Sequence, residues 1–220
     1  PEETIIDGEG ARRVVLCNSG EGAGTIIEGF TITGGFVFAG SDLWFVYGGG
    51  IYCYESSPTI SGCTITGNSP HGYSKWFEDQ EYGWYEVYYP GHGGGIYALQ
   101  GAVIQSSLIY SNQSNYGGAL TLFDSAADAC TVENNTNNDR VSGILLRDST
   151  AANCISWSDE SGLYEGYPGS FVHCALPGPP EPAADGGGNL NLDPLFEPGG
   201  YALQRSWPGS PCACPVSTLD

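Results

Sequence analysis

The stretch that decides the fold runs from Gly48 to Ser69 and reads GGGIYCYESSPTISGCTITGNS. Its opening, GGGIYC, recurs at residues 93–98 as GGGIYA and, more loosely, at 117–121 and 142–146. A short run of alternating apolar and polar residues follows each copy, as is typical of a β-strand with one buried face. A repeated unit that carries short strands indicates structural repeats that stack on one another.

The spacing of these runs gives the length of one unit. The last five begin at Cys63, Ser107, Cys130, Cys154 and Cys174, which are 44, 23, 24 and 20 residues apart, and the 44 corresponds to one unit plus an insertion. A period of about 22 residues with two or three short strands predicts one coil of a β-solenoid, whereas a leucine-rich repeat would need a leucine ladder. We therefore expect an all-β chain that forms a single domain, 1–220, of about six to seven coils.

Stacked coils place equivalent residues in columns about 4.8 Å apart. One predicted interior column is Phe30, Cys63, Ser107, Cys130, Cys154 and Cys174, and another is Cys17, Cys53, Ala98, Thr121 and Leu146. A third column lies at a corner and contains Asn68, Asn112 and Asn135, followed by Asp159. Asparagine tolerates the left-handed conformation of a tight corner, and stacked amides can hydrogen-bond along the column, so we expect an asparagine ladder.

These repeats, together with TIIDGEG at 4–10, IIEGFTITGG at 26–35 and NLNLDPLFEPGGYALQRSWPGSPC at 189–212, resemble the right-handed parallel β-helix repeat proteins of bacterial extracellular and surface origin. That family shares the superfold of the pectate lyases. The resemblance covers nearly the whole chain apart from two insertions. It implies a right-handed parallel β-helix with a closing coil at 189–214, but no particular activity, because this architecture hosts unrelated functions.

Charge and cysteine content restrict the setting. The chain has six basic and 25 acidic residues, and its net charge of −19 is unsuited to binding the phosphates of nucleic acids. It contains no apolar run long enough to span a membrane. Eight cysteines indicate an oxidising compartment. We expect an extracellular or cell-surface protein whose signal peptide has been removed.

Cysteines in one column would lie near enough to form disulfides. The candidate pairs are Cys17 with Cys53, and Cys154 with either Cys130 or Cys174, while Cys212 and Cys214 could pair with a cysteine that the column leaves over. The alternative is a ladder of buried free thiols, because cysteine packs well as a small apolar residue.

Two insertions, 36–47 and 69–92, hold 13 of the 27 aromatic residues and should pack together as a lateral lobe. Three roles are open: a satellite core, an interface with another subunit, or a sugar-binding platform. The candidate contact residues are Phe36, Trp44, Phe45, Trp76, Phe77, Trp84 and Tyr85. Nearby Glu78, Asp79 and Glu81 are calcium candidates, although no regular calcium-binding loop is present.

No catalytic residue emerges from the sequence. Gly91-His92-Gly93 matches one polygalacturonase element by its letters, but the accompanying carboxylate and basic elements are missing. We expect a non-enzymatic extracellular structural protein, without a cofactor other than calcium, that self-associates head to tail into a filament or surface layer. The alternatives are a polysaccharide-binding adhesin, with extracellular glycans as partners, and a polysaccharide lyase or hydrolase of the same class.

Overall fold

The computed structural model describes residues 4–38, 46–81, 83–115, 117–137, 141–157, 162–163, 168–177 and 185–191. These residues form an all-β structure, and no helix occurs among them. Three sheets of parallel strands run along the molecule, side by side. Shorter two-stranded sheets extend from one corner of this arrangement.

The strands fall into three long sheets and three small ones. Sheet 1 consists of β1 (Thr4–Arg12), β4 (Phe30–Phe38), β8 (Thr64–Thr66), β15 (Leu108–Tyr110), β19 (Thr131–Glu133) and β23 (Ile155–Trp157), with β9 (Ser69–His71) paired to the end of β4. Sheet 2 consists of β2 (Val15–Cys17), β6 (Ile51–Cys53), β13 (Ile96–Leu99), β17 (Leu120–Phe123), β21 (Ile144–Arg147) and β24 (Gly162–Leu163). Sheet 3 consists of β3 (Ile26–Glu28), β7 (Thr59–Ser61), β14 (Val103–Gln105), β18 (Ala126–Asp128), β22 (Ser149–Ala152) and β25 (Gly169–Val172). The small sheets pair β10 (Tyr73–Asp79) with β11 (Gly83–Tyr89), β5 (Val46–Tyr47) with β12 (Gly91–His92), and β16 (Gln113–Ser114) with β20 (Thr136–Asn137).

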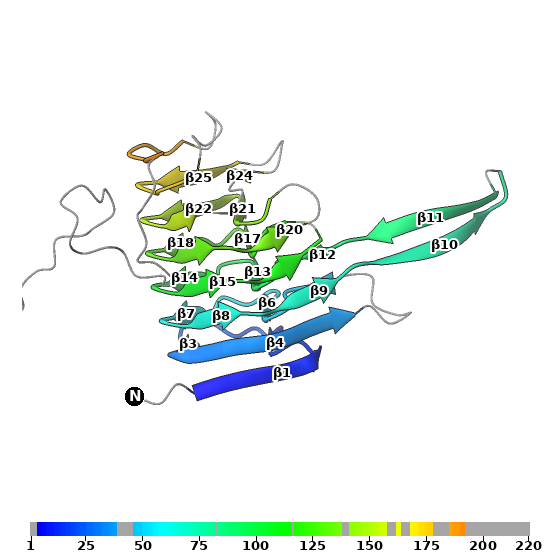
Figure 1. Cartoon of the computed structure of the whole chain (residues 1–220), viewed down its shortest axis with the longest axis horizontal. Coiled ribbons are helices and arrows are strands. Elements are labelled where there is room, and N and C mark those ends of the chain that lie inside the picture. The colour runs from blue at the N-terminus through cyan, green and yellow to red at the C-terminus, as the bar shows by residue number, and fades with distance from the viewer. Residues whose placement is uncertain are drawn as a thin grey trace, which may run out of the picture.

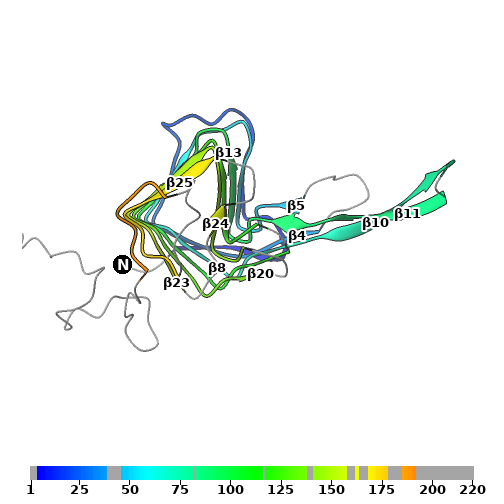
Figure 2. The same ribbon diagram turned by 90° about the horizontal axis from the view of Figure 1, so that it is seen from above.

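The chain visits sheets 1, 2 and 3 in turn, so that each coil contributes one strand to each sheet (Figure 1). The described strands form six such coils, beginning with β1, β2 and β3 and ending with β23, β24 and β25. Viewed from above, successive coils superimpose along the stack (Figure 2). This arrangement of stacked parallel sheets is consistent with a β-solenoid.

The core consists of columns of inward-facing apolar residues, one from each sheet. In sheet 1, Ile32, Ile65, Ile109 and Val132 are in register and fully buried. In sheet 2, the register aligns Cys17, Cys53, Ala98, Leu122 and Leu146. The prediction that Thr121 belongs to this column was wrong by one residue. Thr121 pairs with Tyr97 and Leu122 with Ala98. Ala98 lies five residues after Gly93, and the residue five positions after Gly117 is Leu122 and not Thr121.

The corner asparagines are buried and hydrogen-bonded along the stack. The Nδ2 of Asn68 donates to Oδ1 of Asn112 at 2.9 Å, and the Nδ2 of Asn112 donates to Oδ1 of Asn135 at 3.1 Å. Each amide also donates to backbone carbonyls of its own coil and the preceding one, and the ladder ends where the N–H of Gly35 donates to Asn68. Asp159, the next residue expected in this column, lies outside the described residues.

The six described cysteines are buried free thiols, so the expected disulfides are not formed. Cys17 and Cys53 do lie opposite each other, and their thiols hydrogen-bond. Cys130, Cys154 and Cys174 form a second thiol ladder. The thiols of Cys130, Cys154 and Cys174 instead donate to the carbonyls two residues earlier, at 3.4, 3.1 and 3.4 Å, and pack as small apolar side chains. Cys212 and Cys214, within the predicted closing coil 189–214, lie outside the described residues.

Candidate functional site

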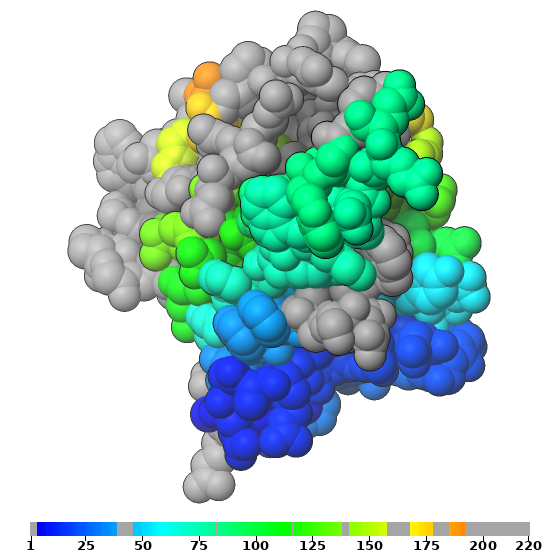
Figure 3. All heavy atoms as spheres, turned by 90° about the vertical axis from the view of Figure 1, so that its right-hand side faces the viewer, coloured from blue at the N-terminus to red at the C-terminus, as the bar shows by residue number. Residues whose placement is uncertain are grey.

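The most prominent surface feature is an antiparallel hairpin of strands β10 and β11, here called the arm (residues 73–89). It leaves the coils at one corner and projects away from them (Figures 1 and 2). When the molecule is viewed from that side, the arm stands in front of the coils (Figure 3). The arm is therefore presented to solvent and does not cover the flank of the solenoid.

The arm is fixed to the coils at its base. The side chain of Asn115 accepts hydrogen bonds from the backbone N–H of Gly72 at 2.7 Å and of Gly91 at 3.4 Å, the two residues that flank the arm. On the neighbouring strands, Val37 and Val46 are buried and pack with Tyr73. These contacts hold both strands of the arm where they emerge from the solenoid.

Residues of the first insertion form part of this base. Residues 36–38 of β4 pair with 69–71 of β9, and the ring of Phe36 stacks on His71 with centroids 6.0 Å apart. Phe36 is thus half-buried beside the arm and is not part of its projecting surface. Trp44 and Phe45, the other candidates of this insertion, lie outside the described residues.

One face of the arm, here called the stacked face, consists of cross-strand pairs that pack on each other. Tyr73 stacks on Tyr89 with ring centroids 5.0 Å apart, and Phe77 stacks on Tyr85 at 5.7 Å. The Lys75 ammonium lies over the Phe77 ring, 5.4 Å from its centroid. A two-stranded hairpin is marginally stable in water, and such aromatic pairs stabilise it.

The opposite face, here called the Trp face, consists of Ser74, Trp76, Glu78, Trp84, Glu86 and Tyr88. Its aromatic side chains are strongly exposed, at 58% for Trp76, 64% for Trp84 and 53% for Tyr88. Among the described residues, no ring contact involves either indole. Trp76 and Trp84 are therefore together on one surface, while Phe77 and Tyr85 stabilise the other.

The calcium candidates do not converge on one point. Glu78 faces Trp84 across the arm, and Oδ1 of Asp79 accepts a hydrogen bond from the N–H of Glu81 at 2.8 Å, which closes the turn at the tip. Among the described residues, no group of three or more histidine, cysteine, aspartate or glutamate side chains could hold a metal ion.

His92, the centre of the Gly-His-Gly element, is a packing residue at the base of the arm. Its ring lies edge-on to Tyr47, 5.2 Å between centroids, and Tyr47 stacks on Tyr97 at 4.3 Å. The guanidinium of Arg13 lies 4.7 Å from the ring centroid of the neighbouring Tyr52 and donates to the carbonyl of Tyr47. Burial lowers the pKa of His92 to about 4, so this histidine is neutral at pH 7.

The burial of His92 predicts acid sensitivity. An unfolded histidine has a pKa of about 6.5, so between pH 6.5 and about 4 the unfolded chain binds a proton that the folded chain does not. The contribution of His92 to stability is complete above pH 6.5 and decreases by up to about 3 kcal/mol as the pH falls through this window. Chemical denaturation at about pH 6.5 and about pH 4 should show a smaller decrease in the free energy of unfolding for His92→Gln than for wild type. The exposed His173→Gln control should behave like wild type, and equal pH slopes for His92→Gln and wild type would contradict this assignment.

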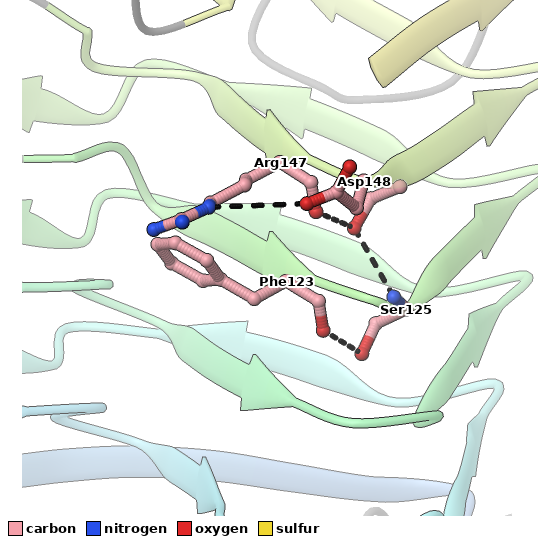
Figure 4. Close-up of polar contacts among 5 residues, drawn as sticks. Phe123, Ser125, Arg147 and Asp148 are labelled. Atoms are coloured by element: carbon pink, nitrogen blue, oxygen red, sulfur yellow. Dashed lines mark hydrogen bonds and ion pairs between the residues drawn. The ribbon is translucent and has the colours of Figure 1, made fainter. Parts of the chain in front are cut away.

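A second candidate is a shallow hollow of about 380 Å³ at a corner between sheets 2 and 3, next to the polar contacts drawn in Figure 4. Asp124 and Asp148 occupy equivalent positions on adjacent coils there, each with a left-handed backbone, φ 46° and 49°. Arg147 contacts Asp148 at 3.9 Å and lies over the Phe123 ring, while Ser125 donates to the Phe123 carbonyl at 2.8 Å. The sequence did not reveal this pair of acids, because paired carboxylates were expected at outward strand positions of adjacent coils.

The chemistry of this hollow is limited. A catalytic carboxyl pair needs two different environments, one of which excludes water. Both carboxylates are exposed to solvent, and Asp148 already contacts a guanidinium. The hydrogen bond with the neighbouring cysteine and burial raise the pKa of Cys53 and of Cys154 far above the usual range, which makes these two thiols unsuited to catalysis. The same pairing lowers the pKa of Cys17, Cys130 and Cys174, but these thiols are buried in the core, away from any substrate. The Trp face is thus the stronger candidate site.

Comparisons with protein-family models, with curated proteins and with solved structures find no match to this chain. Among the described residues, no helix is long and apolar enough to cross a membrane.

Proposed function

We propose that the chain is a non-enzymatic extracellular binding protein in which a solenoid scaffold presents the arm to a partner molecule. The observation that carries the proposal is the Trp face, on which Trp76, Trp84 and Tyr88 are exposed together. Exposed tryptophan and tyrosine are the side chains most enriched at binding hot spots, because they bury a large area at low entropic cost.

The architecture supports this role. The described hydrophobic core of the solenoid contains no residue of the arm, so the exposed rings of the arm add nothing to that core. The base is held by Asn115 and by the small apolar cluster at Val37 and Val46, which orients the arm without covering the Trp face. A surface that is held in place and left open reduces the entropy lost when a partner binds.

We also propose a more specific fold and a location for the chain. We assign the coils to a right-handed parallel β-helix of the bacterial extracellular type, with an extracellular or cell-surface location. The repeat segments in the sequence and the general preference of parallel crossovers for the right hand support this assignment. The free thiols give it no support, since buried cysteines are compatible with any compartment.

A retention assay tests the binding role. Immobilised chitin, cellulose, chitosan and poly-L-arginine serve as neutral-glycan and cationic probes. Wild type should be retained on at least one of them, and Trp76→Ala/Trp84→Ala should reduce that retention at least about tenfold, because hot-spot truncations cost 2 kcal/mol or more. The control Ile26→Ala removes an equally exposed residue, 61%, from the solenoid and should be retained like wild type. Retention on no probe, or equal retention of the double variant, would contradict the proposal.

A second candidate function is head-to-tail assembly, and the first coil favours it. The outer edges of β1, β2 and β3 face no further strand among the described residues. The inward-facing Val15 and Ile27 are only partly buried, although their equivalents Ile51 and Ile60 are fully buried. Such an edge can pair with the last coil of another copy.

Assembly of this kind should depend on salt. Each copy carries a net charge of −19, so repulsion between copies should weaken as added salt screens it. Sedimentation velocity should show a growing fraction of oligomers between about 0.02 and 0.5 M NaCl. A monomer throughout this range at high protein concentration would contradict the assembly role, while leaving the binding role of the arm intact.

A further inference from the structure

We propose that the partner of the Trp face is a positively charged, arginine-bearing segment of another protein. This inference rests on the proposed function of the arm and names the chemistry that the arm recognises.

The first support is the alternation of aromatic and acidic side chains across the arm. Trp76 is directly opposite Glu86, and Trp84 is directly opposite Glu78. Directly opposed residues have Cβ atoms about 5 Å apart, and diagonal neighbours are within reach of long side chains. Each exposed indole therefore has a carboxylate beside it on the same face.

The second support is the lack of a cation on this face. Lys75, the single lysine of the chain, lies over Phe77 on the stacked face. Among the described residues, no ion pair involves Glu78 or Glu86. Asp79 and Glu81 add further negative charge at the tip of the arm. The Trp face thus combines aromatic surface with two carboxylates, Glu78 and Glu86, that no described residue of the chain neutralises.

An arginine side chain matches both components. A guanidinium stacks on an indole through cation–π attraction, and its planar set of N–H donors binds a neighbouring carboxylate with two hydrogen bonds. A lysine ammonium can make the same contacts only as a point charge, so it should bind less strongly. Two indole–carboxylate pairs in succession suit a partner segment with more than one arginine.

A second copy of this chain fits the face poorly. Two chains that each carry a charge of −19 repel one another. The described arginines already have contacts within the chain: Arg12 pairs with Glu9, Arg13 donates to the Tyr47 carbonyl, and Arg147 lies over Phe123. A neutral glycan could stack on the indoles but would leave the carboxylates without a cationic partner.

The test is titration calorimetry of the full chain with octa-arginine and octa-lysine peptides. Wild type should bind octa-arginine more tightly than octa-lysine. Glu78→Gln/Glu86→Gln, which retains both indoles, should weaken octa-arginine binding at least about tenfold. The control Glu28→Gln/Asp124→Asn removes the same number of exposed charges from the solenoid and should stay within about twofold of wild type.

The outcomes separate this inference from the proposed function. Equal losses in the two charge variants would mean that the peptide responds only to net charge, which overturns the inference. Unchanged binding by Glu78→Gln/Glu86→Gln, or tryptophan-dependent retention on neutral chitin or cellulose alone, would also overturn it while the arm remains a binding surface. If Trp76→Ala/Trp84→Ala binds every probe like wild type, the proposed function itself fails.

Discussion

Replacing Asn112 by leucine is expected to lower the free energy of unfolding by about 3–5 kcal/mol. The Asn112 amide donates to the carbonyls of Ile65 and Tyr110 at 2.9 and 3.1 Å, and it donates to Asn135. Its Oδ1 accepts from both the backbone N–H and the Nδ2 of Asn68. Leucine would leave these buried groups without their partner, and each unsatisfied group costs about 1–3 kcal/mol.

The matched control is Asn134→Gly. Asn134 is exposed beside the ladder and has a left-handed backbone, φ 52°, which glycine adopts without strain. Denaturant unfolding should therefore place this control within about 1 kcal/mol of wild type. A similar loss in both variants would show that the ladder adds no specific stability.

Replacing Gly49 by alanine is expected to destabilise the chain by about 3 kcal/mol or more. A Cβ at this position would lie 2.6 Å from the carbonyl oxygen of Gly94 and 2.8 Å from the backbone nitrogen of Ser69. Both are backbone atoms of adjacent segments, so no flexible side chain can move to relieve the overlap. Two coils would have to separate locally, which would weaken the hydrogen bond from Gly49 to Gly93.

The control for this substitution is Gly24→Ala. A Cβ at Gly24 would meet no atom within 4 Å, and its backbone is not left-handed. Thermal unfolding should leave this variant at or slightly above the wild-type melting temperature, because alanine restricts the unfolded chain. Equal melting temperatures for Gly49→Ala and Gly24→Ala would contradict the close approach of the coils.

The all-β architecture and most of its register could be predicted, because stacked coils require similar residues at equivalent positions of each repeat. The asparagine column of Asn68, Asn112 and Asn135 was readable from spacing alone. The slip at Thr121 occurred in one of the loose copies of the repeat, since GGALT departs from GGGIY after its first two glycines. Equivalent spacing also suggested disulfides, but spacing cannot distinguish a disulfide from a pair of buried free thiols.

The sequence predicted which residue types the candidate site contains, but not how they are arranged. The density of aromatic residues in 69–92 indicated a functional segment, but the division into a stacked face and a Trp face depends on the cross-strand register of β10 and β11. Period-two alternation assigns Trp76 and Phe77 to opposite faces, yet it does not say which face packs. Asn115, which fixes the base of the arm, gave no signal because its partners Gly72 and Gly91 are distant in sequence.

Backbone hydrogen exchange with and without octa-arginine is the most direct test of the claim that the arm binds an arginine-bearing partner segment. If the claim is correct, the peptide should slow exchange in segments covering residues 73–89 and leave the core strands of the solenoid unchanged. Unchanged exchange in 73–89 under saturating peptide, or protection confined to the coils, would contradict it.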